Sequence, residues 1–121
     1  MFKKILKSFP YAFQGIIYSF ITQVNFRFHI TAALLALLLS FVLRVSNLEL
    51  LFVISAVFLV LTAELFNTAV ETVVDLYTRE YNFMAQTAKN IAAGAVLTAV
   101  IYSLTVAAVV FIPKILNLLR V

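Results

Sequence analysis

Long runs of apolar residues, separated by short polar stretches, dominate the sequence. Residues 91–113 form the clearest run, because they carry no charged side chain and lie between Lys89 and Lys114. A helix needs about 20 apolar residues to cross the hydrocarbon of a bilayer. The pattern therefore predicts a spanning helix at about residues 88–113. Residues 28–43 are equally free of charge between Arg27 and Arg44, whose stems can extend to the interface, and they predict another span at about residues 26–45.

A further apolar run begins at Leu48 and passes through a carboxylate. It stays apolar to Ala63, meets Glu64, and then continues at helical spacing to Leu76. We therefore predict one helix over about residues 48–76 that leaves the hydrocarbon and enters the polar interface. In the turn before it, Ser46 or Asn47 can serve as the N-cap.

The first 22 residues differ from the spans because their apolar positions are periodic rather than continuous. Apolar side chains recur every three or four residues, at Phe2, Ile5, Leu6, Phe9, Phe13, Ile16, Ile17 and Phe20. Lys3, Lys4 and Lys7 occupy other faces, which predicts a basic amphipathic helix over about residues 1–22 that lies along the membrane plane. A signal peptide is the competing interpretation, but the periodicity and the lack of a small-x-small cleavage site disfavour it.

Composition supports the same picture of one all-α integral-membrane domain over residues 1–121. Of the residues, 64% are hydrophobic and only 12% are charged, and the mean hydropathy is +1.10. A soluble domain of this size needs a more polar surface. The absence of cysteine excludes disulfides, thiol nucleophiles and thiolate metal sites. On this background the net charge of +4 indicates membrane orientation and anionic headgroups, not nucleic-acid binding.

The distribution of basic residues predicts which side faces the cytoplasm. The N-terminal segment and the second connection hold Lys3, Lys4, Lys7, Arg27, Arg79 and Lys89, whereas the other side holds Arg44, Lys114 and Arg120. Because cytoplasmic segments carry the excess of lysine and arginine, both the N-terminus and the second connection are predicted to be cytoplasmic.

A polar stripe on the helix predicted at residues 48–76 is the most informative feature. At 100° per residue its members fall within about 100° of one another on the helix surface; they are Glu64, Asn67, Thr68, Glu71 and Asp75. Three of the chain's five acids lie on this face, which begins at the membrane boundary. A carboxylate there is costly unless it is neutral, paired or metal-bound, so the stripe is a candidate site.

The spacing of the stripe allows its two glutamates to have different roles. Glu64 and Glu71 stand two turns apart, roughly 10 Å along the axis. One can hold a divalent cation while the other, nearer the hydrocarbon, accepts a proton from a hydroxyl, and Asn67 can orient either. Oxygen ligands without histidine or cysteine fit magnesium, and Lys89 can meet phosphate oxygens. Asp75 and Lys89 alone are equally compatible with helix-end pairing, and the stripe leaves enzyme, transporter and ion channel open.

Three segments resemble the prokaryotic diacylglycerol kinase family, which includes the undecaprenol kinases of Gram-positive bacteria. They are Ala63-Glu64-Leu65-Phe66-Asn67-Thr68-Ala69-Val70-Glu71, then Val74-Asp75, and Ala88-Lys89-Asn90-Ile91-Ala92-Ala93-Gly94-Ala95-Val96-Leu97. The resemblance covers essentially the whole chain, including Asn25-Phe26-Arg27-x-His29 and the Arg79-Glu80-Tyr81 connection.

The resemblance implies a homotrimer with one surface helix and three spanning helices per chain, and active sites shared between subunits at the cytoplasmic interface. The implied reaction moves the γ-phosphoryl group of Mg²⁺-bound ATP to the hydroxyl of a membrane lipid. The matching positions are Glu64 for the catalytic base, Glu71 for a metal ligand, Asn67 for a residue of the same site, Lys89 for a phosphate-contacting lysine and Asp75 for another active-site acid. Lys4 and Lys7 match basic residues of the surface helix near the nucleotide.

Two positions depart from the family pattern. Gln23 stands where the family has its other metal-binding carboxylate, so the resemblance implies a weaker, neutral magnesium ligand there. Asn90 replaces the acid that often follows the motif lysine, and it keeps an acceptor without the charge. His29 stands where some relatives carry an acid, and we interpret it as an interfacial hydrogen-bonding residue.

The expected function is therefore a lipid kinase with ATP as co-substrate and Mg²⁺ as cofactor. Undecaprenol is the expected substrate, because Asn25-Phe26-Arg27 and Ala92-Ala93-Gly94-Ala95-Val96 look more like the Gram-positive branch, and diacylglycerol is the alternative. A proton-coupled transporter is a rival hypothesis, but the acids gather at one boundary and no inverted repeat is visible. A non-catalytic membrane subunit is a third hypothesis, motivated by Gln23 and Asn90.

Overall fold

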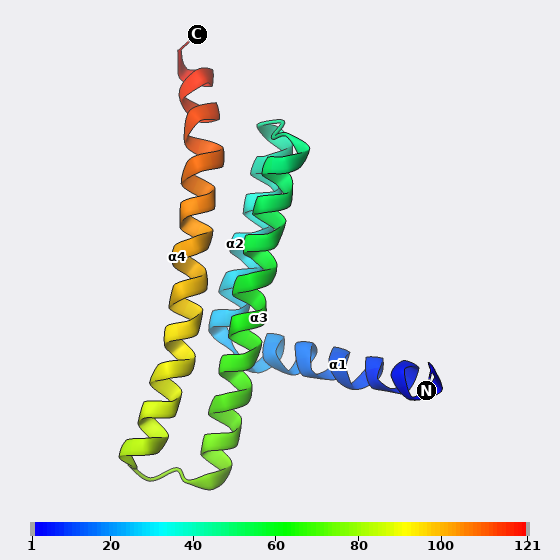
Figure 1. Cartoon of the computed structure of the whole chain (residues 1–121), viewed down its shortest axis with the longest axis vertical. Helices are drawn as coiled ribbons and strands as arrows, with labels where there is room; N and C mark the ends of the chain where they lie inside the picture. The colour runs from blue at the N-terminus through cyan, green and yellow to red at the C-terminus, as the bar shows by residue number, and fades with distance from the viewer. Residues whose placement is uncertain (1, 121) are drawn as a thin grey trace.

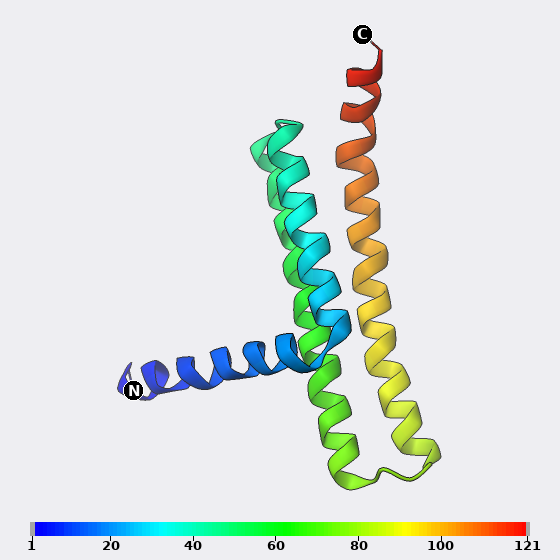
Figure 2. The same cartoon turned by 180° about the vertical axis from the view of Figure 1, so that it is seen from behind.

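The computed structural model describes residues 2–120, with the side chains of Phe2 and Lys4 outside the described part. It contains four α-helices: α1 (Phe2–Thr22), α2 (Val24–Val42), α3 (Asn47–Tyr77) and α4 (Phe83–Leu119). In Figure 1, α2, α3 and α4 run alongside one another, and α1 projects sideways from the bundle; Figure 2 shows the same arrangement from behind. The predicted all-α fold is confirmed.

The helix ends differ from the predicted ends where the chain leaves the hydrocarbon. Helix α4 begins at Phe83 because Asn82 caps it, with Oδ1 accepting a hydrogen bond from the backbone N–H of Ala85 at 3.0 Å. At its other end it continues through Pro113 to Leu119. Lys89 therefore lies in the second turn of α4 rather than at its start.

The turn between α2 and α3 is fixed by a capping box. The Ser46 hydroxyl accepts a hydrogen bond from the Glu49 backbone N–H at 3.3 Å, and the Glu49 carboxylate accepts one from the Ser46 backbone N–H at 2.6 Å. Each contact satisfies a backbone donor that the first turn of a helix leaves free. Glu49 also pairs with Lys114 at 3.0 Å, which ties the start of α3 to the end of α4.

Helix α3 is the central helix, because α2 and α4 both pack against it. Its buried face begins with Val53, Ala56 and Val60, and these residues recur at three- and four-residue intervals. Val53 packs with Val110 and Phe111 of α4 in a small apolar cluster, and the buried Ala99 lies further along α4. Small residues at such contacts let spanning helices approach closely.

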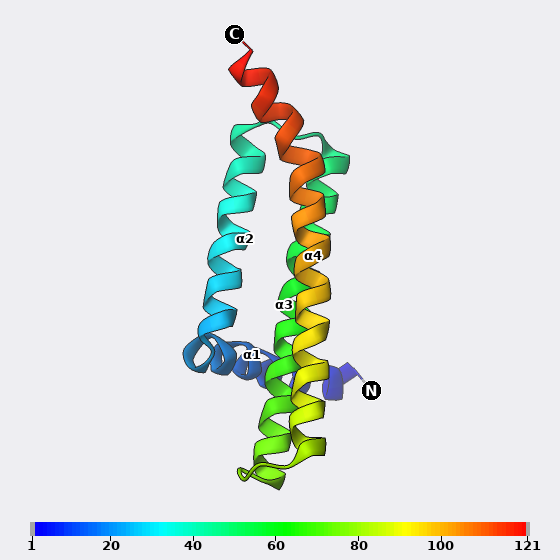
Figure 3. The ribbon, with the colours of Figure 1, turned by 90° about the vertical axis from the view of Figure 1, so that its left-hand side faces the viewer.

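The lengths of α3 and α4 place part of each helix outside the hydrocarbon. With 31 and 37 residues at 1.5 Å per residue, they extend for about 46 and 55 Å, against about 30 Å for a bilayer core. Helices α2, α3 and α4 are each long and apolar enough to span, which makes this a multi-pass membrane protein. Figure 3 shows α3 and α4 extending past the level of α1 at the end where they are joined.

Helix α1 crosses α3 near residues 65–73 and does not run alongside it (Figures 1 and 3). Between the two helices is an open cavity of about 470 Å³, lined by Ala12, Gly15, Ile16 and Tyr18 of α1 and by Leu65, Thr68, Ala69, Thr72 and Val73 of α3. An amphipathic helix in the membrane plane marks the interface. The polar stripe is therefore level with the expected membrane boundary.

Candidate functional site

The polar stripe continues the packing face of α3. The buried positions Val53, Ala56 and Val60 are followed on the same face by Glu64 and Asn67, at the same spacing. Glu64 is only 2% exposed, and the adjacent Thr68 is also buried and donates a hydrogen bond from its hydroxyl to the Glu64 carbonyl oxygen at 3.0 Å. The carboxylate thus faces the inside of the bundle and not the lipid.

Asn67 connects the two glutamates of the stripe. Its Nδ2 donates a hydrogen bond to Oε1 of Glu71 at 3.2 Å, and Glu71 is half-buried. The Asn67 side chain is 7% exposed, and its Oδ1 is buried without a hydrogen-bond partner among residues 2–120. A buried acceptor without a hydrogen-bond partner lowers the stability of the fold by about 1–3 kcal/mol. A ligand that offers a donor or a cation to Oδ1 would recover that free energy.

His29 brings α2 into the same site. It is half-buried. The His29 ring packs edge-on against Phe28, with ring centroids 5.8 Å apart. His29 and Val60 also line a cavity of about 250 Å³, mostly apolar, bounded by α2, α3 and α4. This cavity and the His29 imidazole therefore lie beside Val60, about one helical turn before Glu64.

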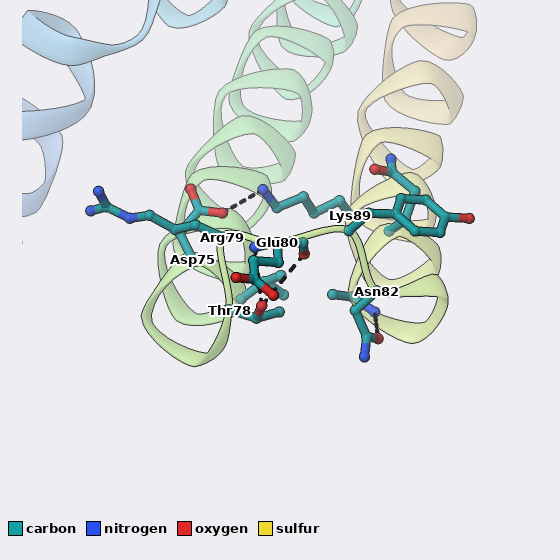
Figure 4. A pocket seen from close by; sticks show the side chains of 10 residues that line it. Asp75, Thr78, Arg79, Glu80, Asn82 and Lys89 are labelled. Carbon is teal, nitrogen blue, oxygen red and sulfur yellow. Dashed lines mark hydrogen bonds and ion pairs between the residues drawn. The ribbon is translucent and has the colours of Figure 1, made fainter.

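Beyond the stripe, the α3–α4 connection forms a polar cavity of about 290 Å³. Figure 4 shows Lys89 reaching from α4 to Asp75 on α3, where Nζ lies 2.5 Å from Oδ1. The other lining residues are Val74, Thr78, Arg79, Glu80, Tyr81, Asn82, Ala85 and Gln86. Thr78 shapes the connection, because its hydroxyl accepts a hydrogen bond from the Glu80 backbone N–H at 3.1 Å. Two cations and several hydrogen-bonding groups are thus gathered around one open cavity.

The remaining predicted site residues lie further from this centre. Asn90 is exposed on α4 and accepts a hydrogen bond from Gln86 at 2.9 Å. Gln23 lies at the junction of α1 and α2, where its Nε2 donates to the Thr22 hydroxyl at 3.3 Å rather than to the stripe. Lys7 is exposed on α1, and the side chain of Lys4 lies outside the described residues.

Sequence reasoning missed part of this site. It included Arg79, Glu80 and His29 only through the resemblance, and it did not predict that Thr78, Asn82 and Gln86 line a cavity with Asp75. The available signal was the cap sequence: an asparagine three residues before Ala85 predicts a helix start at Phe83. That start would have placed Gln86 and Lys89 on successive turns facing α3.

Comparison with known proteins identifies the family of this chain. The sequence profile of the prokaryotic diacylglycerol kinase family matches residues 10–111. The chain is 35% identical to an undecaprenol kinase of Bacillus subtilis over 92% of this chain and 90% of that protein. It is 37% identical to a diacylglycerol kinase of Synechocystis over 95% of this chain and 66% of that protein. A diacylglycerol kinase of Escherichia coli is 35% identical over 83% of this chain and 82% of its own length.

These matches span the surface helix, the stripe and the α3–α4 connection together. The profile begins within α1 and ends within α4, so it includes Glu64, Asn67, Glu71, Asp75 and Lys89. On this ground the chain belongs to the prokaryotic diacylglycerol kinase family.

Proposed function

We propose that this lipid kinase transfers the γ-phosphoryl group of Mg²⁺-bound ATP to the hydroxyl of a membrane lipid, with undecaprenol as the preferred acceptor. Family membership supplies the class of reaction, an ATP-dependent phosphoryl transfer to a lipid. The observation that carries the proposal is the position of Glu64, a buried carboxylate on the packing face of a spanning helix, level with α1. A lipid hydroxyl at the membrane interface marked by α1 would lie at this level.

Glu64 is the proposed base. It stands where the apolar face of α3 becomes polar, so it is the stripe residue nearest the hydrocarbon. A base must lie within hydrogen-bonding reach of the proton it accepts. The mostly apolar cavity lined by Val60 and His29 lies about one helical turn from Glu64. Glu64 would take the hydroxyl proton as the hydroxyl oxygen attacks the γ-phosphorus, and the bond from that phosphorus to the bridging oxygen of ADP would break.

The donor set next to Glu64 fits magnesium. Glu71 offers carboxylate oxygens, and the buried Oδ1 of Asn67 lies on the side chain already bonded to Glu71. Among the described residues, no group of three or more His, Asp or Glu side chains could hold a metal alone. A Mg²⁺ ion bound there would therefore take its remaining ligands from phosphates and water. When bound, Mg²⁺ would neutralise charge on the transferring phosphoryl group.

Gln23 is the second proposed metal ligand. It lies at the α1–α2 junction of its own chain, away from Glu71. We therefore propose that it would contribute its amide oxygen to the metal in a site shared between subunits of a homotrimer. An amide adds no charge, so the ATP phosphates would supply more of the coordination shell.

The cavity at the α3–α4 connection is the proposed nucleotide site. Lys89 would contact phosphate oxygens, with Asp75 holding its amine in place, and Asn67 would orient Glu71. Asn90 lies one residue beyond Lys89 and offers an acceptor to the nucleotide. Lys4 and Lys7 of α1 would add positive charge on the same side of the membrane. Phosphoryl transfer needs chiefly such positioning and charge neutralisation.

The topology that fits this chemistry is a cytoplasmic-membrane protein with its N-terminus and α3–α4 connection in the cytoplasm, where ATP is found. The basic residues of α1 and of that connection support this orientation. The relatives named undecaprenol kinase and diacylglycerol kinase define the two acceptors to compare.

The test is a phosphorylation assay with purified protein in lipid bicelles. Radiolabelled ATP and Mg²⁺ are supplied with undecaprenol or diacylglycerol, and the lipid products are separated by thin-layer chromatography. We expect labelled undecaprenyl phosphate to form faster than labelled phosphatidic acid. Tight binding of Mg²⁺-ATP without either product would contradict the proposed function, and phosphatidic acid as the main product would overturn the lipid preference alone.

A further inference from the structure

The junction between α1 and α2 is a tight, well-packed elbow. Helix α1 ends at Thr22, Gln23 alone adopts an extended conformation, with φ −103° and ψ 113°, and α2 begins at Val24. Ser19 and Phe26, on either side of the bend, are both buried, and Phe26 is among the most buried large side chains of the described residues. A single extended residue leaves the direction of α1 dependent on the contacts around it.

Arg27 provides a contact that crosses this bend. Its Nη1 donates hydrogen bonds to the carbonyl oxygens of Ile21, at 2.8 Å, and Phe20, at 3.2 Å. Both carbonyls belong to the last turn of α1, which has no further helical N–H groups to bond. One side chain of α2 therefore caps the end of α1.

The placement of this charge is informative. The last turn of α1 contains no basic residue of its own, and Arg27 lies in the first turn of α2. A cation is disfavoured at the N-terminus of its own helix and favoured at the C-terminus of another. The charge of Arg27 is thus unfavourable near the N-terminus of α2, but the carbonyl groups at the C-terminus of α1 stabilise it.

The rest of α1 is held loosely by the chain itself. Its large apolar side chains are exposed, among them Leu6, Phe9 and Phe13. An open cavity separates its middle from α3 at Leu65–Val73. The elbow is therefore the main constraint that a single chain places on the direction of α1.

We propose that Arg27 is a positioning residue that fixes the direction of α1 and so keeps α1 beside the stripe of α3. Its guanidinium acts through the carbonyl groups of α1 and touches no reacting atom. The kinetic part of this inference rests on the proposed function, because it assigns to α1 the task of aligning the lipid acceptor beside Glu64.

The alternative role for a boundary arginine is to extend toward lipid phosphates. That role would depend on the charge alone and would leave the direction of α1 unchanged when the arginine is replaced. Arg44 is a matched control, because it flanks the other end of α2, is exposed, and makes no interaction across a helix junction comparable to that of Arg27 within the described residues.

A distance measurement tests the structural part. The chain has no cysteine, so spin labels can be placed at Leu6→Cys on α1 and Leu76→Cys on α3, both at exposed positions. Labelled chains are diluted with unlabelled protein so that distances within one chain dominate the dipolar signal. We expect Arg27→Met to broaden the distance distribution and Arg44→Met to leave it unchanged. An unchanged distribution in Arg27→Met overturns the proposal.

Kinetics test whether the direction of α1 matters for the reaction. We expect Arg27→Met to raise the KM for the lipid about five- to tenfold, a range typical of lost positioning by a charge-assisted contact, with a much smaller change in the KM for ATP. Arg27→Lys keeps a hydrogen-bond donor on a shorter side chain. It should therefore partly restore both the narrow distance distribution and the low KM for the lipid. It also serves if Arg27→Met does not fold. A broadened distribution with an unchanged lipid KM overturns the positioning role, whereas inactivity of the unmutated protein bears on the proposed function alone.

Discussion

Lys89 and Asp75 join α4 to α3 by an ion pair, with Nζ 2.5 Å from Oδ1, at the edge of the cavity formed by the α3–α4 connection. Asp75 is about half exposed and Lys89 about one third exposed. An exposed pair of this kind contributes at most about 1 kcal/mol to stability. Its main consequence is geometric, since it holds the amine of Lys89 at the wall of this cavity.

Removing the amine should therefore affect the reaction far more than the fold. We expect Lys89→Met to lower kcat/KM for ATP by about 100-fold, because a charge-assisted contact to phosphate is lost at the transition state. The thermal midpoint should change little. Steady-state kinetics with varied ATP, alongside circular dichroism melting, measure both quantities.

Lys114→Met is the matched control for this variant. Lys114 is the other lysine of α4, and it pairs with Glu49 at the opposite end of the bundle, with a similar exposure. It should retain nearly full activity. Equal losses in the two variants would mean that Lys89 acts only as a helix tie.

Glu64→Gln should abolish turnover and leave the bundle folded. The amide has the same shape but cannot accept the hydroxyl proton, and a general base contributes about 10²- to 10⁴-fold to rate. Glu49→Gln, on the first turn of the same helix, serves as the control. Product formation at the unmutated rate in Glu64→Gln would exclude its role as base.

Much of the fold follows from the sequence because a bilayer restricts it so strongly. Runs such as residues 91–113 must become helices, since the hydrocarbon offers no partner for free backbone groups. Part of the site could also be predicted. The spacing of Glu64, Asn67 and Glu71 places them on one helical face, and in the structure Glu64 and Asn67 are buried and Glu71 is half-buried. Their catalytic roles stay predictions.

The contacts between elements could not be predicted in the same way. The sequence contains Arg27 and Lys89, but nothing local to either residue indicates that one caps α1 and the other pairs with Asp75. The start of α4 at Phe83 was also missed, because hydropathy marks where hydrocarbon begins and a helix can begin earlier in water. Relative placement of helices depends on packing that a linear pattern does not encode.

Replacing Asn67 by leucine should lower activity without lowering thermal stability. Its Oδ1 is buried without a partner among the described residues, so Asn67→Leu removes an unsatisfied acceptor that costs about 1–3 kcal/mol. We expect an unchanged or higher thermal midpoint together with a loss of activity of about 100-fold, because Glu71 loses its orienting donor and the site loses an acceptor. Asn117→Leu, on an exposed turn of α4, should change neither quantity. Retained activity in Asn67→Leu would remove Asn67 from the site.

Gln23→Glu tests whether the α1–α2 junction reaches the metal in the assembled protein. The substitution adds a negative charge where the proposed site has only an amide oxygen, and hard cations bind more tightly as carboxylate ligands increase. The Mg²⁺ concentration for half-maximal activity should therefore fall severalfold, and only the weak contact with Thr22 would be lost. Gln14→Glu adds the same charge to an exposed position of α1 and controls for general attraction of cations to the surface. Equal shifts in both variants, or none in Gln23→Glu, would place Gln23 outside the metal site and leave Glu71 as the proposed protein carboxylate.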